Sequence, residues 1–262
     1  MKIAIIGAGN MGGAVASGIA SVLADVTVTV SNPSEGKLEK LRERFPSIVT
    51  TTSNAEAAAG ASVIILAVKP WILPGVVAEL RETIEREMPA VVSMAGGIGL
   101  DAIEEMIGEG CSPAVFYVIP NTAASTGESM TFMAQRRGTA AQIADVTRLF
   151  GACGKVSVVE ERMVDAGMVT ASCGIAFAMR FMRAMEQGAV ELGLRPCEAR
   201  KAVIQTLKGA AVLLESTGAH PEDAIDAVTT AGGLTIRGLN AMEAGGFSAA
   251  VEAGMHSAMP KR

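Results

Sequence analysis

Residues 2–20 of the chain are KIAIIGAGNMGGAVASGIA, and three patterns meet in this short stretch. The five residues before Gly7 form an apolar run, which is typical of a strand buried on both faces. Gly7, Gly9 and Gly12 follow with the spacing GxGxxG, and the Ala-rich residues after them favour a helix. A strand, a glycine turn and the start of a helix together predict a site for the pyrophosphate of a dinucleotide.

Each glycine has a separate physical task in such a turn. Gly7 makes the tight turn, Gly9 allows the backbone to approach the pyrophosphate, and Gly12 allows the helix to pack closely on the strand. Asn10 and Met11 lie in the first turn of the expected helix, whose free N–H groups and dipole attract an anion. The alternative is a glycine-rich turn that binds nothing.

The pattern of the first 160 residues extends this motif into a fold. Short β-branched runs alternate with helical stretches, and strands are expected at residues 2–6, 26–30, 62–68, 90–95, 114–119, 129–134 and 155–159. This alternation predicts an α/β, Rossmann-type, mostly parallel sheet in a dinucleotide-binding domain at 1–160. Residues 161–262 contain no convincing strand, so we expect an all-helical C-terminal domain there for substrate binding and oligomerisation.

Composition excludes several classes of protein. Half of the 262 residues are hydrophobic, so the chain is not disordered, and a net charge of −5 with only 3% aromatic residues argues against nucleic-acid binding. The four cysteines form no CxxC pair and only two histidines are present. We therefore expect no metal site, and four free thiols in a reducing, cytoplasmic compartment.

Two apolar segments bear on membranes and partners. Residues 3–24 carry no charge, but their bunched glycines argue against a spanning helix or a signal peptide, so no membrane association is expected. A stripe of small residues, including Gly167, Ala171 and Gly174, follows helical spacing within the helix expected at 161–192. This stripe and the low charge predict a homo-oligomer that associates through the C-terminal helices, with a self-contained bundle as the alternative.

The end of the second strand indicates which nucleotide is bound. An NAD site usually has Asp or Glu there, but this chain has Ser31, Asn32 and Pro33. The first carboxylate after the strand is Glu35. Neutral groups tolerate a 2′-phosphate and Lys37 could neutralise it, so NADPH is favoured over NADH. Asp at position 31 is then expected to shift the preference toward NADH. Alternatively, Lys37 belongs to a solvated helix face.

The scarcity of proton-transfer residues limits the chemistry. A hydroxy-acid dehydrogenase needs a general base, but His220 and His256 stand outside any motif, and no lysine occurs between Lys155 and Lys201. A protonated imine accepts hydride without such a base, and positioning dominates the rate. The segment 232–235, GGLT, offers backbone N–H groups for a substrate carboxylate. Alternatively, it is an ordinary helix start with Thr235 as the capping residue.

Several motifs together resemble the pyrroline-5-carboxylate reductase family. GAGNMG at 7–12 resembles the phosphate loop of that family, and Asn54 stands where the family has an asparagine. ILAVKP at 65–70 and PNTAASTGE at 120–128 also match. The most specific match is TTAGGLTIRGLNAME at 229–243.

The resemblance implies NADPH-dependent reduction of 1-pyrroline-5-carboxylate to L-proline, the last step of proline biosynthesis. It implies that Thr235 orients the ring nitrogen, that Thr230 contacts the carboxylate, and that Lys69 completes the catalytic set. The implied substrate contacts are Thr230, Gly232, Gly233, Leu234 and Thr235. The implied cofactor contacts are Gly7, Gly9, Asn10, Met11, Gly12, Ser31, Asn32, Asn54, Ala67, Val68, Lys69, Pro70 and Asn121.

Some positions depart from the pattern of the family. Tyr117 replaces an arginine, Ala123 replaces a proline, and ASCGIAF at 171–177 replaces SGSGPAY. These changes concern the polar groups of the substrate pocket and leave two alternatives open. One is an NADP-dependent dehydrogenase or imine reductase of another small acid, and the other is a non-catalytic NADP(H)-binding paralogue.

Overall fold

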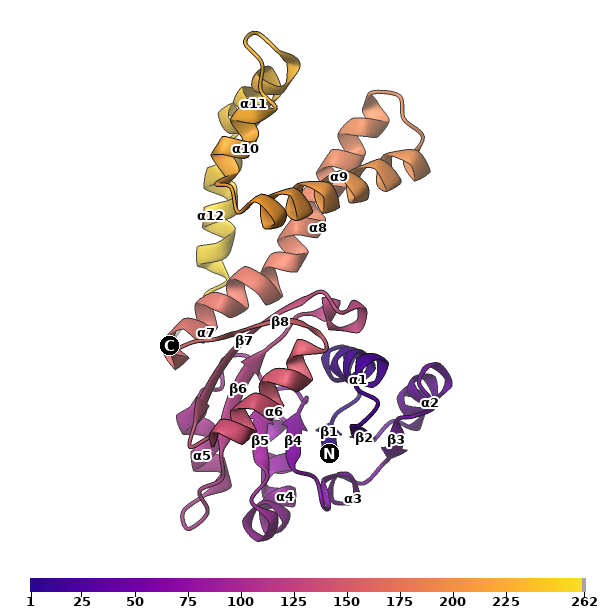
Figure 1. The fold of residues 1–262 in the computed structure, drawn as a ribbon, viewed down its shortest axis with the longest axis vertical. Helices are drawn as coiled ribbons and strands as arrows, with labels where there is room; N and C mark the ends of the chain where they lie inside the picture. The colour runs from indigo at the N-terminus through magenta and orange to yellow at the C-terminus, as the bar shows by residue number, and fades with distance from the viewer. Residues whose placement is uncertain (261–262) are drawn as a thin grey trace. The chain divides into compact units, whose positions relative to one another are not determined.

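The structure, a computed structural model, describes residues 1–260 and contains two compact units. The first unit holds Met1–Cys173 together with the end of the chain from Met259, and the second holds Gly174–Ala258. The last two residues of the helical domain expected at 161–262 lie outside the described residues. The first unit is α/β and the second is helical (Figure 1), which confirms the expected fold class.

One eight-stranded sheet organises the first unit. Its order is β3-β2-β1-β4-β5-β6-β7-β8, and all neighbours are parallel except β6 and β7. The sequence predicts seven of these strands and misses β3. The strands are β1 (Lys2–Ile6), β2 (Thr27–Ser31), β3 (Val49–Thr51), β4 (Val63–Leu66), β5 (Ala90–Ser93), β6 (Val115–Ile119), β7 (Ser129–Arg136) and β8 (Gly154–Val158).

Helices cover both faces of the sheet, which explains the continuous apolar runs. In β1, Ile3 and Ile5 pack into one hydrophobic core, whereas Ala4 and Ile6 pack into the other. The first core receives side chains from α1 (Asn10–Val22), α2 (Glu35–Arg44) and α6 (Ala140–Gly151). The second receives them from α3 (Asn54–Ala58), α4 (Leu73–Glu87), α5 (Leu100–Ile107) and α7 (Glu161–Gly167).

Helix α1 packs on its neighbours through glycines. A Cβ atom on Gly12 would lie 1.9 Å from the carbonyl oxygen of Gly7, so only glycine allows the helix to approach the strand this closely. Likewise, a Cβ atom on Gly18 would lie 2.7 Å from the Cys153 sulfur. Burial raises the pKa of the Cys153 thiol to about 12, so this cysteine is an uncharged core residue at neutral pH.

The chain is helical without interruption from Glu161 to Glu191, as the sequence predicts, but residues Met168–Cys173, labelled η2, form a π-helical turn. The predicted domain boundary at 160/161 lies just after the last strand, which ends at Val158. The first compact unit continues to Cys173 because α7 packs on β6 and β7. Gly167, a member of the small-residue stripe, lies against the Phe132 ring of β7. That part of the stripe therefore packs on its own sheet rather than on a partner helix.

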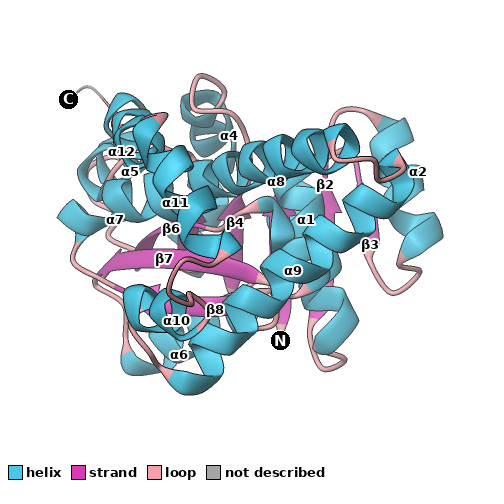
Figure 2. Cartoon of the chain, turned by 90° about the horizontal axis from the view of Figure 1, so that it is seen from above, coloured by secondary structure: helices cyan, strands magenta, loops and turns pink. Residues whose placement is uncertain are grey.

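The second unit consists of helices and loops (Figure 2). It contains α8 (Gly174–Glu191), α9 (Pro196–Thr217), α10 (Pro221–Ala227), α11 (Leu234–Ala244) and α12 (Phe247–Ser257). Helices α8 and α9 pack together, and the rings of Phe181 and Phe247, 5.6 Å apart, join α8 to α12. Of these five helices only α9 has buried residues, Ala199 and Val203. The unit alone therefore covers little of its apolar surface.

Within residues 1–260, the segment Glu161–Glu191 is the only helix that passes a length-and-composition test for crossing a membrane.

Two glycines of α1 give a direct test of how this fold is held. Gly12→Ala should lower the melting temperature strongly, because its methyl group meets the Gly7 carbonyl and must push the helix away from the strand. Gly13→Ala, one residue further on, meets nothing within 4 Å and should leave stability unchanged or raise it by about 0.5–1 kcal/mol. Thermal unfolding of both variants measures the difference. Equal melting temperatures would mean that the close approach is not required.

Candidate functional site

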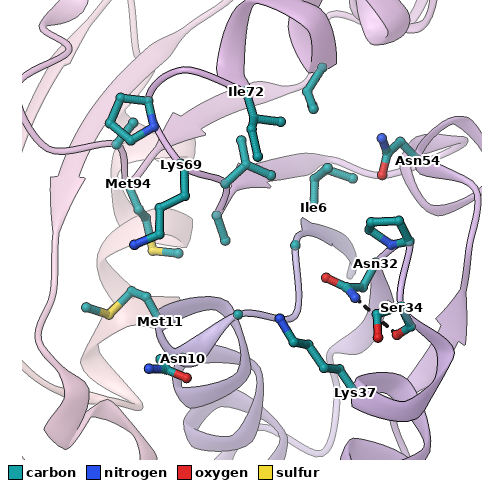
Figure 3. A pocket seen from close by; sticks show the side chains of 18 of the residues that line it. Ile6, Asn10, Met11, Asn32, Ser34, Lys37, Asn54, Lys69, Ile72 and Met94 are labelled. Atoms are coloured by element: carbon teal, nitrogen blue, oxygen red, sulfur yellow. Dashed lines mark hydrogen bonds between the residues drawn. The ribbon is translucent and has the colours of Figure 1, made fainter.

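A cavity of about 810 Å³ in the first unit opens at the carboxyl ends of β1 and β4. The strand order reverses between these two strands, and in open α/β sheets such a reversal leaves a crevice where ligands bind. Figure 3 shows Lys37, Ser34 and Asn32 around one end of the cavity, and Lys69, Met94 and Met11 around the other. The two lysines are the charged residues of the described lining, which contains no carboxylate.

The glycine turn forms the centre of the cavity wall. Gly7 has φ +109° and donates its N–H to the Ser31 carbonyl at 2.8 Å, which ties the turn after β1 to the end of β2. Gly9 is the N-cap of α1, and a Cβ there would meet nothing within 4 Å. No side chain caps this helix and no acid lies in its first turn. The N–H groups of the first turn are thus free of a side-chain partner, and the cradle fits a pyrophosphate.

Gly12 has a different role from the one predicted for a cofactor contact. It is buried and does not line the cavity, because its task is the close contact with the Gly7 carbonyl. It therefore supports the cradle from behind.

Ser31 is also an internal residue. It is fully buried, and its hydroxyl donates to Oδ1 of Asn54 at 2.7 Å, while Nδ2 of Asn54 donates to Glu79 at 2.7 Å. Asn54 lines the cavity and Ser31 does not. The expected effect of Asp at position 31 is therefore not a simple change of cofactor. A carboxylate there would be buried and would face the Asn54 oxygen. We therefore expect Asp at position 31 to lower the stability of the fold as well as to act on cofactor preference.

Asn32 lines the cavity, but its side chain makes hydrogen bonds to other parts of the protein. Its Oδ1 accepts the N–H of Ala8 at 3.1 Å, and its Nδ2 donates to the Ser34 carbonyl at 3.1 Å. Asn32 thus ties the glycine turn to the loop after β2. Ser34 and Lys37, on that loop and at the start of α2, are exposed groups of the lining that carry no hydrogen bond from their side chains among those described.

The other end of the cavity joins three strand ends. Ala67, Val68, Lys69 and Pro70, which are predicted cofactor contacts, follow β4, and all four line the cavity. The other contributors are not among the predicted site residues, although Pro33 and Thr122 lie in segments that the sequence analysis names. These contributors are Ile6, Pro33, Ser34, Thr52, Ile72, Val76, Met94, Ala95, Gly96 and Thr122. The signal that could find them is topological, since Met94–Gly96 and Thr122 follow β5 and β6 at the same edge of the sheet.

Asn121 is the remaining predicted cofactor contact, and in the structure it is buried behind the residues that line the cavity. It is 6% exposed, and the cavity lining includes its neighbour Thr122 instead. Its side chain caps the 3-10 turn η1 (Thr122–Thr126) by accepting the N–H of Ala123 at 3.0 Å, and it donates to the Ala171 carbonyl at 3.2 Å.

The predicted substrate residues form a separate loop in the second unit. The N–H of Gly233 donates to the Thr230 carbonyl at 2.9 Å, and a Cβ on Gly233 would lie 2.5 Å from the Thr230 hydroxyl. Gly232 has φ +69°, so both glycines are required by the turn. Gly233 is the N-cap of α11, which has no side-chain cap. Thr235 lies exposed in the first turn, so the alternative that Thr235 caps the helix is wrong.

The two histidines have structural surroundings. His220 is the N-cap of α10, and its Nδ1 accepts the N–H of Glu222 at 3.2 Å. His256 is exposed in the last turn of α12. Neither histidine lines the cavity. Among residues 1–260, no three His, Cys, Asp or Glu side chains are grouped to hold a metal ion.

Comparisons with known proteins agree with the motifs. A model described as pyrroline-5-carboxylate reductase dimerisation matches residues 161–262, and one described as NADP oxidoreductase, coenzyme F420-dependent, matches residues 2–97. Pyrroline-5-carboxylate reductase 3 of Danio rerio is 36% identical over 253 residues, which cover 95% of this chain and 86% of the relative. The Corynebacterium melassecola reductase is 34% identical over 95% of this chain and 92% of its own.

Solved structures show the same fold along the whole chain. A pyrroline-5-carboxylate reductase from Coxiella burnetii aligns with a TM-score of 0.87 and 27% identity, over 98% of this chain and 95% of that one. A Plasmodium falciparum pyrroline carboxylate reductase, solved with NADP bound, aligns with a TM-score of 0.88 and 24% identity over the same shares of the two chains. By its sequence along nearly its full length, the chain belongs to the pyrroline-5-carboxylate reductase family.

Proposed function

We propose that this protein is an NADPH-dependent pyrroline-5-carboxylate reductase, which reduces the cyclic imine 1-pyrroline-5-carboxylate to L-proline. The observation that carries the proposal is the cavity at β1 and β4, with a glycine cradle at its centre and a lysine near each end. Bound NADPH supplies the hydride. The decisive experiment is complementation of a proline auxotroph that lacks its reductase, together with the assay of NADPH oxidation by the purified protein.

The first unit holds the cofactor through groups that do not exchange protons. The free N–H groups at the start of α1 bind the pyrophosphate, and Ser34 and Lys37 bind the 2′-phosphate of the adenosine. Asn54, oriented by Ser31 and Glu79, contacts the adenosine. Ala67, Val68, Lys69 and Pro70 lie beside the nicotinamide. NADPH is favoured over NADH because the lining offers Lys37 to the 2′-phosphate and no carboxylate to oppose it.

The loop before α11 binds the substrate. Thr235 orients the ring nitrogen with its hydroxyl, Thr230 contacts the carboxylate, and the N–H groups around Gly232–Leu234 stabilise the negative charge. A protonated imine is already electrophilic, so the protein has to orient it and exclude water rather than remove a proton. The scarcity of proton-transfer side chains is therefore consistent with this reaction, whereas a hydroxy-acid dehydrogenase would need a base.

The two parts of the chain divide these tasks. Residues 1–160 form the cofactor domain, and residues 161–262 bind substrate and make the oligomer through the C-terminal helices. Support for the oligomer comes from the match to the dimerisation model and from the lack of buried residues in α8, α10, α11 and α12. A cytoplasmic location is supported by the four cysteines, all of which are free.

Cofactor preference should depend on Lys37. Lys37→Ala should lower kcat/KM with NADPH about tenfold and leave kcat/KM with NADH nearly unchanged, because only NADPH carries the 2′-phosphate. Lys40→Ala, on the same helix but outside the cavity, is the matched control and should behave like the wild type. A wild-type preference for NADH would contradict the assignment.

Thr235 should matter far more than either histidine. A hydrogen bond to a charged group contributes about 1.5–3 kcal/mol, so Thr235→Ala should lower kcat/KM about 10- to 150-fold. Thr235→Ser keeps the hydroxyl and should recover most of the activity, and affinity for NADPH should barely change in either variant. His220→Ala and His256→Ala should stay within a few-fold of the wild type. An inactive histidine variant beside an active Thr235→Ala would favour the dehydrogenase alternative.

Association should depend on the apolar face of the second unit. Val212 and Leu213 of α9 are 52% and 51% exposed, and replacing both by Glu should shift light scattering toward the mass of one 26.8 kDa chain. Val22→Glu changes an exposed valine of α1 in the first unit and should leave the mass unchanged. If the wild type is itself a monodisperse, active monomer, the oligomer is excluded.

A further inference from the structure

We propose that Asn121 is a positioning residue for this reaction rather than a cofactor ligand. It fixes one wall of the cavity by binding the π-helical turn Met168–Cys173. The inference rests on the proposed function, because the wall in question is the one beside Lys69 and the nicotinamide.

The side chain of Asn121 makes two hydrogen bonds inside the protein. Its Oδ1 accepts the N–H of Ala123, and its Nδ2 donates to the carbonyl of Ala171, at 3.0 Å and 3.2 Å. The hydroxyl of Ser129 in turn accepts the backbone N–H of Asn121 at 3.0 Å. Asn121, Ser129 and Ala171 are all buried. An amide in this position serves one donor and one acceptor of the protein at once, and Asn121 is buried and outside the cavity lining, so its bonds point to a role within the protein.

The π turn explains why such a side chain is needed. A π turn replaces the i→i+4 bonds of an α-helix by wider i→i+5 bonds and disturbs the regular pairing of its carbonyl groups. Ala171 lies within this turn and is buried, and its carbonyl accepts a hydrogen bond from Nδ2 of Asn121. Asn121 follows strand β6, so this bond ties the turn to another part of the fold, and losing a buried hydrogen bond is costly.

The π turn contacts two segments that line the cavity. Thr122, next to Asn121, belongs to the lining, and Gly96 belongs to it as well. Met168, the first residue of the turn, packs so closely on Gly96 that a Cβ there would lie 2.9 Å from its sulfur. The turn is thus bound to two lining segments, after β5 through Met168 and after β6 through Asn121. Displacing it moves both segments, and small displacements near reacting atoms are costly in rate.

The test compares two replacements that keep the branched shape of the asparagine side chain. Asn121→Leu removes both hydrogen bonds and cannot ionise. Asn121→Asp keeps an acceptor for the Ala123 N–H, but its ionised form cannot donate to the Ala171 carbonyl, whereas its protonated form can. Burial favours the protonated form, so the bond should return as the pH falls. The titratable and charged side chains on the elements around position 121 are common to both variants: Tyr117, Glu128, Arg136, Lys155, Glu161, Arg162, Asp165 and Cys173.

For Asn121→Leu we expect kcat to fall about tenfold or more, with the KM for NADPH within about twofold of the wild type. For Asn121→Asp the ratio of its kcat to that of the wild type should rise as the pH is lowered from about 8 to about 5.5, while the same ratio for Asn121→Leu stays constant. Ser125→Ala, which removes a hydroxyl bond from the same 3-10 turn, is the control and should retain wild-type kinetics.

Two measurements without turnover separate this proposal from the proposed function. The fluorescence of bound NADPH reports the surroundings of the nicotinamide, and it should differ from the wild type in Asn121→Leu and recover at low pH in Asn121→Asp. The melting temperature of Asn121→Asp relative to the wild type should recover over the same pH range. Unchanged kcat, a raised KM for NADPH with unchanged kcat, or a pH-independent defect in Asn121→Asp would each overturn the proposal. A wild type that binds NADPH without reducing the imine would instead refute the proposed function.

Discussion

The contact between Gly12 and the carbonyl of Gly7 is the constraint on which the rest of the first unit depends. It brings α1 onto the end of β1, so that the first turn of the helix faces the crevice between β1 and β4. The same contact leaves Gly9 with open space in front of its backbone. A helix placed farther away would still fold, but its N–H groups would no longer form the floor of the cavity. The absence of a side chain at Gly12 therefore determines both how closely α1 packs on β1 and where the N–H groups of its first turn lie.

Much of the fold follows from the sequence, because strands buried on both faces must be apolar throughout. The missed strand β3 has only three residues, Val49–Thr51, and lies at the edge of the sheet, where neither face has to be apolar. The antiparallel direction of β7 follows from its short connection to the neighbouring strand β6, residues 120–128, which leaves no room for a crossover helix. The π turn at Met168–Cys173, by contrast, is not predictable from its own residues, since its contacts are with residues distant in sequence, such as Asn121 and Gly96.

The site was predictable to the level of segments rather than of side chains. Motif spacing places Ser31, Asn121 and Gly12 at the right edge of the sheet, but it does not state which side of the backbone faces the cavity. Ser31 turns to Asn54 and Asn121 turns to Ala171, so both support the wall from behind. Small polar side chains at strand ends serve equally well as ligands and as internal hydrogen-bond partners, and only the three-dimensional neighbours decide between these roles.

The start of a helix is the common feature of the two proposed binding segments. Gly9 before α1 and Gly233 before α11 both have extended backbone, and both helices lack a side-chain cap and an acid in the first turn. Gly99 before α5 is the instructive contrast, because there the Leu100 N–H is taken by Glu161 at 2.7 Å. A glycine N-cap costs only a few tenths of a kcal/mol relative to Ser or Asp, yet it leaves the N–H groups available. For a chain with a net charge of −5, such local donors, not the overall charge, are what can hold an anionic cofactor and an anionic substrate.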